Sequence, residues 1–362
     1  LTIFIIALLI STLGILSIYS STYQREGDLW QNIFQRQILW VLIGIVLFFI
    51  VSGLSYRWLW DWTYALYIIA VLFLLLVIFL GQERLGAQRW LNFGWFNFQP
   101  SEFAKIVMTV FIARYFSRKS ESSVSLISGR FGIFRGLLFP LFFVSVPFLL
   151  IVDQPDLGTG LVVLFLFVSM LYLTNVKLRY IIILLVLLIL PTPFMWHFLR
   201  DYQKDRILVF LNPYIDPLGA GYTVIQSKIA IGSGGFFGKG WLSGTQSQLR
   251  FLPEGHTDFI FASFSEEWGF LGGLGLLFLY YLLIRQGLLI AKRTNDHFGK
   301  LMAYGISFML SIQIFINIAM NMGLAPVVGI PLPLMSYGGT SVLITFISLG
   351  ILANIDKKRA VF

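Results

Sequence analysis

Long apolar runs, at residues 68–80, 137–152, 161–173 and 180–190, constrain this chain more than any other feature. Each is about the length or the core of the apolar stretch of roughly 20 residues that a helix needs to cross a bilayer. Apolar residues make up 57% of the chain and charged residues only 12%, about half the charge of a soluble domain. The sequence therefore predicts an all-α polytopic membrane protein, because a water-soluble core cannot bury so many apolar runs.

Ten helices are expected, within one integral membrane domain over residues 1–362. Their expected ranges are 1–19, 34–52, 62–80, 101–116, 137–152, 158–174, 178–196, 258–287, 299–322 and 339–355. The connection at 197–257 is much longer than an ordinary loop, which indicates a functional or a disordered segment. Its aromatic content argues against disorder, so we expect a large structured loop. Apolar residues at helical spacing over 222–231 predict an amphipathic helix there, ended by the Gly-Ser-Gly-Gly segment at 232–235.

Basic residues are distributed unequally between the two sides of this arrangement. Of the 26 Lys and Arg residues, fifteen fall in connections on the side of the N-terminus and five in short connections on the other side. The other six lie in the 197–257 loop, where the positive-inside bias does not apply. The asymmetry predicts that both termini are cytoplasmic. Attraction of the basic side to anionic lipid explains the net charge of +9, so no nucleic-acid partner is expected. Thirteen of the 17 acidic residues lie at the outer side, where we expect the functional site.

The segment 99–105 (QPSEFAK) is the first candidate for chemistry. Gln99 or Ser101 can cap a helix that begins there, and Glu102 and Lys105 are i,i+3 neighbours on one helical face. They form either a capping acid with a lysine that reaches for the membrane surface, or an ion pair lining a polar cavity. Arg89, close by in sequence, carries a guanidinium group suited to phosphate.

Two further acidic groups lie next to predicted helices. Asp153 and Asp156 frame a short turn and either cap it or contact a substrate or cation. Asp258 lies where the long loop enters the next helix, so Thr257 or Asp258 is either an N-cap or part of a catalytic site. Desolvation among the neighbouring aromatic residues would raise the proton affinity of the Asp258 carboxylate, as a general base requires. His256 is expected to be a hydrogen-bonding neighbour.

Glycine and proline are concentrated at 323–341, which predicts broken or re-entrant backbone, either lining a cavity or serving as a kinked packing element. Absence of cysteine excludes thiolate sites, and the scattered histidines argue against a His-based metal centre. The segment 234–240 resembles a phosphate-binding loop but lacks its first glycine and its Ser/Thr. No nucleotide is therefore expected.

These segments together resemble the SEDS family (shape, elongation, division and sporulation), and within it the rod-shape-determining RodA branch. The resemblance rests on residues 317–341, 99–105, 154–158 and 256–261, and for the branch on 244–249 and 329–334. It implies a peptidoglycan glycosyltransferase with ten transmembrane helices in the bacterial cytoplasmic membrane. Such an enzyme joins lipid II units into glycan strands at the outer face, for cell elongation and shape.

The resemblance also implies roles for particular residues. Asp258 corresponds to the family's catalytic aspartate, and Glu102 and Lys105 correspond to its cavity-lining pair. The residues expected to bind substrate are Glu102, Lys105, Arg89, Gln99, Ser101, Asp156, Thr257 and Ser336. A divalent cation, Mg²⁺ or Mn²⁺, would suit the available carboxylates, although the sequence specifies no ligand set. The implied partners are a class B penicillin-binding protein and other elongation-complex membrane proteins. A lipid II flippase and a non-catalytic scaffold for cell-wall synthases are the alternative functions.

Overall fold

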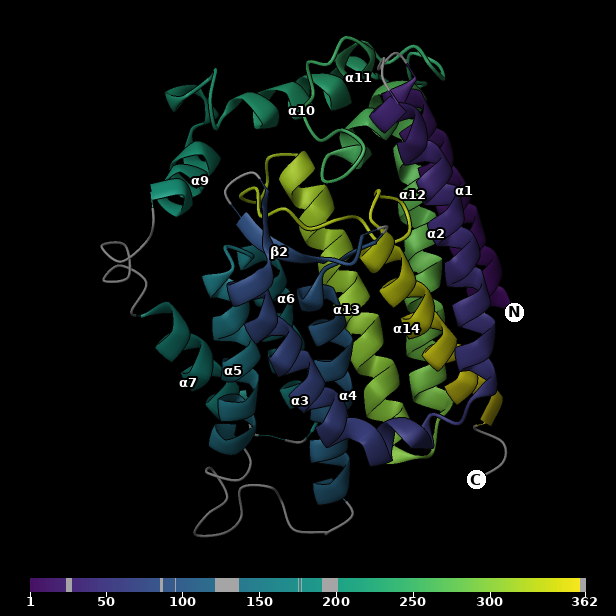
Figure 1. Ribbon diagram of the computed structural model, residues 1–362, viewed down its shortest axis with the longest axis vertical. Helices are drawn as coiled ribbons and strands as arrows, with labels where there is room; N and C mark the ends of the chain where they lie inside the picture. Colours follow the sequence, from purple (N-terminus) through teal and green to yellow (C-terminus); the bar gives the residue numbers. More distant parts are fainter. Residues whose placement is uncertain are drawn as a thin grey trace.

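The computed structural model describes residues 1–23, 28–84, 87–94, 96–120, 137–174, 176, 178–190 and 201–358 as a bundle of roughly aligned helices with a smaller layer across one end (Figure 1). The bundle helices are α1 (Thr2–Thr22), α2 (Asp28–Gly53), α3 (Arg57–Leu80), α4 (Pro100–Ser120), α5 (Phe139–Asp153), α6 (Leu157–Leu173), α7 (Leu178–Ile189), α12 (Ile260–Arg293), α13 (His297–Asn321) and α14 (Gly339–Lys358). Each of the ten predicted ranges therefore contains a helix.

Helix boundaries differ from the predicted ones where charged residues extend a helix beyond its apolar run. Helix α3 begins at Arg57 rather than at 62, because residues 57–61, which include two charged side chains, are also helical. The predicted end of the seventh helix, at 196, lies outside the described residues. Among the described residues, six helices are long and apolar enough to cross a membrane, and α5, α6 and α7 are shorter apolar helices. The exact number of spans, ten, stays a prediction.

A layer of short helices covers one end of the bundle, which we call the loop side (Figure 1). It contains α9 (Asp201–Leu211), the 3₁₀ turn η3 (Pro213–Ile215), α10 (Tyr222–Ser233) and α11 (Thr245–Gln248). Helix α10 confirms the helix predicted over 222–231, and it ends within the predicted Gly-Ser-Gly-Gly segment. Helix α9 was not predicted, because its mixed polar and apolar sequence has no strong helical pattern.

A small antiparallel sheet between α3 and α4 was also not predicted. Its strands are β1 (Gln82–Arg84), β2 (Ala87–Asn92) and β3 (Asn97–Phe98), in the order β1-β2-β3. The hydroxyl group of Thr340, at the start of α14, donates to the carbonyl of Asn97 at 3.1 Å and accepts from the backbone N–H of Gln99 at 3.2 Å. The sheet is thereby fixed against α14.

Helix α12 is interrupted at Gly269, whose φ of 66° and ψ of −163° are non-helical. The loop segment 234–240 packs on this interruption. The backbone N–H of Lys239 donates to the carbonyl of Glu266 at 3.0 Å, and the Lys239 ammonium contacts the buried Glu266 carboxylate at 2.7 Å. The segment that resembles a phosphate-binding loop therefore joins the loop layer to α12.

The α13–α14 segment (residues 322–338) returns into the bundle without forming a helix, as predicted for broken backbone. Its apolar side chains from Val328 to Met335 are buried in protein, whereas Met322 and Leu324 at its start are exposed. The buried part satisfies the requirement for irregular backbone at membrane depth. It packs closely on two helices: a Cβ on Gly14 of α1 would lie 2.7 Å from the Met335 Cα, and a Cβ on Gly158 of α6 would lie 2.7 Å from the Val328 carbonyl oxygen.

Candidate active site

Two asparagines of α13 fix the backbone at Asp258. The Asn317 and Asn321 side-chain amides donate to the Asp258 carbonyl oxygen at 3.0 and 2.9 Å. The Asn321 amide oxygen also accepts from the backbone N–H of Ala262, in the first turn of α12, at 3.1 Å. The N-cap of α12 is Phe259, which makes no side-chain cap. Asp258 is therefore not a helix cap, and its carboxylate is available for another role.

The Asp258 carboxylate faces Arg89 of β2 across Gly329. Gly329 has a φ of 72°, in the left-handed region, and a Cβ built on it would lie 3.4 Å from Asp258 Oδ2 and 3.6 Å from Arg89 Nη1. Three elements far apart in sequence thus meet here: the small sheet, the turn before α12 and the α13–α14 segment. Glycine leaves open the space between the acid and the guanidinium group.

The electrostatic surroundings raise the pKa of Asp258 from 3.8 to about 6. Burial of the carboxyl group is the largest cause, followed by the negative charge of Glu254; Asp156 acts in the same direction. Arg89 and Arg206 act in the opposite direction and keep the shift moderate. A carboxyl group with this pKa is mostly ionised at neutral pH and still binds a proton more readily than an ordinary aspartate, as general-base catalysis requires.

Asp156 is the centre of a hydrogen-bond network between β2, α4 and α6. Its carboxylate is fully buried, accepts from Ser101 Oγ at 2.8 Å and from Gln99 Nε2 at 3.2 Å, and lies 3.9 Å from Arg89 Nη1. The same carboxylate caps α6 by accepting from the backbone N–H of Thr159 at 3.4 Å. Arg89 also donates to the Pro155 carbonyl oxygen. Both interpretations of Asp156, helix cap and site residue, are therefore compatible with its contacts.

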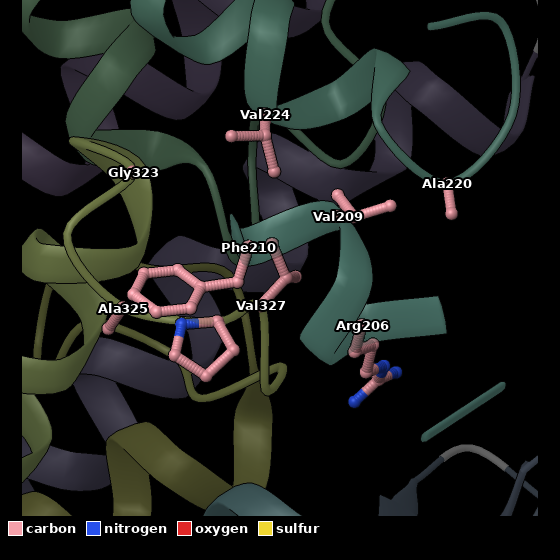
Figure 2. A pocket seen from close by; sticks show the side chains of 9 residues that line it. Arg206, Val209, Phe210, Ala220, Val224, Gly323, Ala325 and Val327 are labelled. Carbon is pink, nitrogen blue, oxygen red and sulfur yellow. The ribbon is translucent and has the colours of Figure 1, made fainter. Parts of the chain in front are cut away.

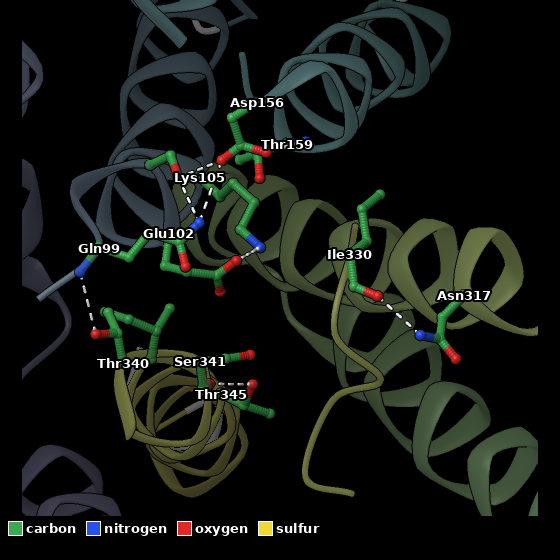
Figure 3. Close-up of polar contacts among 12 residues, drawn as sticks. Gln99, Glu102, Lys105, Asp156, Thr159, Asn317, Ile330, Thr340, Ser341 and Thr345 are labelled. Atoms are coloured by element: carbon green, nitrogen blue, oxygen red, sulfur yellow. Dashed lines mark hydrogen bonds and ion pairs between the residues drawn. The ribbon is translucent and has the colours of Figure 1, made fainter. Parts of the chain in front are cut away.

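Glu102 and Lys105 form an ion pair inside the bundle, with 2.6 Å between Oε1 and Nζ (Figure 3). Their side chains are only 2% and 1% exposed, so Lys105 does not reach for the membrane surface. Figure 3 shows the pair between α4 and α14, close to Asp156. The ion pair is confirmed, and its contact with substrate stays a prediction.

Ser336 and Thr257 hold the turn before α12 against the α13–α14 segment. Ser336 Oγ donates to the Thr257 carbonyl oxygen at 2.6 Å and accepts from the backbone N–H of Leu332 at 2.7 Å. The Thr257 hydroxyl group donates to the Glu254 carboxylate at 2.8 Å. The backbone carbonyl of His256 accepts from the N–H of Tyr337 at 2.9 Å. These contacts position Asp258, and substrate binding by either hydroxyl group stays a prediction.

Arg206 of α9 is a site residue that the sequence did not identify, because no motif surrounds it. It lines a small hollow between α9, α10 and residues 323–327 (Figure 2). The rest of the lining is mainly apolar, including Val209, Phe210, Val224 and Val327. Its charge is the weakest of the five influences on the pKa of Asp258, and it acts to lower that pKa. Arg89 of the sheet is therefore the guanidinium group at the Asp258 site, and Arg206 of the loop layer acts on that site only through its charge.

The fold and the site define an integral membrane protein with a cluster of acidic and basic side chains at one end of its helical bundle. The family model for FtsW, RodA and SpoVE, described as cell cycle protein, matches residues 1–361. The chain belongs to this family.

Similar proteins agree over nearly the whole chain. Peptidoglycan glycosyltransferase MrdB of Escherichia coli (strain K12) is 43% identical over 359 residues, which are 99% of this chain and 93% of that protein. A chain from a structure described as "Structural coordination of polymerization and crosslinking by a peptidoglycan synthase complex" has a TM-score of 0.82 and 32% identity, covering 99% of this chain and 97% of that one. The crystal structure of rod shape determining protein RodA of Thermus thermophilus has a TM-score of 0.72 and 27% identity, covering 99% and 96%.

Proposed function

We propose that this peptidoglycan glycosyltransferase uses Asp258 as the general base that joins lipid II units into glycan strands. The observation that carries the proposal is the position of the Asp258 carboxylate, which faces Arg89 across the space left open by Gly329. A partly buried carboxyl group with a pKa of about 6 opposite a cation suits a reaction in which one substrate loses a proton and the other releases an anion.

In the proposed reaction, the Asp258 carboxylate takes the proton from the 4-hydroxyl group of the acceptor sugar. The hydroxyl oxygen attacks the anomeric carbon of the donor, and a new glycosidic C–O bond forms. The bond between that carbon and the polyprenyl pyrophosphate breaks on the opposite face, with inversion, and the pyrophosphate keeps the electron pair. The proton remains on Asp258 until it passes to solvent.

The departing pyrophosphate needs positive charge nearby. Arg89 and, more weakly, Arg206 are the cations that act on Asp258, and Lys105 is buried and paired with Glu102. A divalent cation is part of the proposal. Mg²⁺ is commonly held by few protein carboxylates together with substrate phosphates. The described residues contain no cluster of three or more His, Cys, Asp or Glu side chains that could hold a metal ion, so the pyrophosphate itself would supply most of the oxygen ligands and Asp258 would remain the base. Such an ion would neutralise charge on the pyrophosphate.

The orientation in the membrane is proposed from charge. Lys292 and Arg293 at the end of α12, and Lys357 and Lys358 at the end of α14, lie at the bundle end opposite Asp258. The positive-inside rule places that end in the cytoplasm of the bacterial cell. Both termini are then cytoplasmic and the site is extracytoplasmic, where lipid II can keep its polyprenyl chain in the bilayer while its head group reaches Asp258.

A crosslinking enzyme is the proposed partner, specifically a class B penicillin-binding protein. Support comes from the similar chain in the peptidoglycan synthase complex, a structure described in terms of polymerization and crosslinking. Other elongation-complex membrane proteins are proposed as further partners, by family resemblance alone.

The test is glycan synthesis from labelled lipid II by the purified chain with its class B partner. We expect wild type to form polymer and Asp258→Asn to lose at least about 100-fold in rate, the lower range for a general base. Asp216→Asn removes a carboxylate of the loop layer that caps only its own turn, and should keep the wild-type rate. A folded Asp258→Asn variant with full activity would refute the proposed base.

The same assay separates the alternative functions. If this chain were a scaffold, no polymer would form once any polymerising activity of the partner itself had been excluded. Lipid translocation in vesicles would then be measured to test for a flippase. A flippase is disfavoured because the polar network described above gathers at the loop side, whereas translocation requires a polar path along the whole crossing.

A further inference from the structure

The aromatic loop (residues 234–241) displays large apolar side chains away from the protein. Phe236, Phe237 and Trp241 are 55%, 79% and 47% exposed. The loop's only charged side chain, Lys239, turns inward to a buried carboxylate of α12. Lys239 keeps 27% of its side chain exposed, but the surface of the loop is mainly apolar. Exposed apolar surface of this kind marks a contact with a partner or a membrane.

Hydrogen bonds to α12 fix this display in place. The backbone N–H of Phe270 donates to the Gly235 carbonyl oxygen at 2.9 Å, and that of Leu271 donates to the Phe236 carbonyl oxygen at 3.2 Å. The interruption of α12 at Gly269 exposes the backbone groups that make these bonds possible. The exposed rings thus belong to a fixed segment of backbone.

The length of α12 places this contact at the membrane boundary. Its continuous part after the interruption at Gly269, residues 270–293, spans about 36 Å at 1.5 Å per residue, whereas the hydrocarbon core is about 30 Å thick, or about 20 residues. Counting back from Lys292 and Arg293, the hydrocarbon ends near residue 270. Burial agrees: residues 260–267 are all buried in protein, and large exposed side chains begin at Trp268 and Phe270.

The aromatic loop continues the membrane-facing surface of the bundle. The Phe236 ring stacks on Phe270, with 5.7 Å between centroids, and Phe270 begins an exposed stripe that continues through Leu274 and Phe278. On its other side, Trp241 lies 6.0 Å from the ring of Tyr19, near the loop-side end of α1. Tryptophan and tyrosine prefer the membrane–water interface.

We propose that the aromatic loop inserts into the leaflet on the loop side, at the boundary between head groups and acyl chains. Phe236 and Phe237 enter the acyl region beside the α12 stripe, and Trp241 lies at head-group level. The loop is an interfacial anchor, comparable in principle to an amphipathic helix lying in the membrane surface. It fixes the height of the loop layer above the bilayer, independently of the reaction proposed for Asp258.

Lipid is the favoured occupant because the patch continues directly from the surface of a membrane span. A protein helix packing there would have to displace lipid from Phe270 and Leu274 as well. A partner helix and a second copy of this chain are therefore outcomes for the test.

The chain contains no cysteine, so single-cysteine variants can be spin-labelled without removing native residues. Phe237→Cys would be labelled with a nitroxide in nanodiscs of phosphatidylcholine and phosphatidylglycerol, and its collision rates with oxygen and with a water-soluble nickel chelate measured. Phe278→Cys on α12 is the lipid reference. Ser243→Cys, at an exposed residue two positions beyond the aromatic loop, is the water reference. Trp241→Cys is a second probe in case Phe237→Cys does not fold.

We expect the label at residue 237 to collide more with oxygen than with nickel, as at residue 278 and opposite to residue 243. Preference for nickel at both 237 and 241 would place the loop in water and overturn the proposal. Low collision rates with both reagents would show that protein covers the patch, and this result would also overturn it.

Discussion

Replacing Asp258 by asparagine should stabilise the protein at neutral pH while it removes polymer synthesis. In the folded chain, burial and the charge of Glu254 raise the pKa of Asp258 from 3.8 to about 6. Above pH 6 the Asp258 side chain is ionised in both states, and its ionisation costs more free energy in the folded protein than in the unfolded chain. The charged carboxylate therefore destabilises the folded protein, and replacing it by a neutral amide removes this cost. The shift of about 2 pH units corresponds to about 3 kcal/mol at 1.36 kcal/mol per unit, which is the upper limit of the expected gain.

The size of this stability change depends on pH. A raised folded-state pKa contributes stability that is fully present below pH 3.8 and is lost as the pH rises through about 6. The advantage of Asp258→Asn should therefore be full above pH 6, shrink between pH 6 and 3.8, and be absent below. Thermal unfolding in detergent would be compared at about pH 7.5 and about pH 4. We expect a higher Tm for the variant only at the higher pH.

Asp216→Asn, at an exposed carboxylate of the loop layer, is the matched control and should show no such gain. A Tm for Asp258→Asn below that of wild type at about pH 7.5 would refute the reasoning. It would mean that Arg89 and Arg206 stabilise the carboxylate by more than its burial costs, and that its proton affinity is not raised.

Three further perturbations test the site. Glu254→Gln should lower the pKa of Asp258, because Glu254 raises it, so the acidic midpoint of the rate profile should move down by part of the total shift; an upward move would contradict this. Glu102→Gln leaves Lys105 as a buried unpaired charge and should destabilise by about 3–5 kcal/mol, whereas Glu102→Gln/Lys105→Met should recover much of the lost Tm. Gly329→Ala should lower the free energy of unfolding by about 1–2 kcal/mol because φ at this residue is positive. The added methyl group fills the space beside Asp258, so polymer synthesis should fall by more than the loss of folded protein explains. Full activity in that variant would mean that substrate does not enter there.

The bundle helices could be predicted because a span must be apolar over most of its length, whatever it packs against. The sheet could not, because β1 and β3 are only 3 and 2 residues long and too short for an alternating pattern. Helix α9 was missed for a related reason: most of its described apolar side chains are exposed and only Val209 is buried, so burial imposes no apolar periodicity on its sequence.

Part of the site followed from local sequence. Asp258 stood out as a carboxylate between a long loop and an apolar helix, and the Glu102–Lys105 pair followed from helical spacing. The contributions of Arg206, Gly329 and the two α13 asparagines could not be predicted from local sequence. Each depends on contact between segments that are far apart in the chain. Only the tertiary structure shows that a glycine in one segment separates an acid and a guanidinium group from two others.

The α13–α14 segment has a consequence for biosynthesis. It contacts α1, α6, β2 and the turn before α12, all of which leave the ribosome earlier. Asp258 therefore has no Gly329 or Ser336 beside it until all but the last helix has been synthesised. A nascent chain that stalls before this point contains Asp258 and Arg89 but lacks the α13–α14 segment that lies between them. We therefore expect incomplete chains in the membrane to have no polymerising activity.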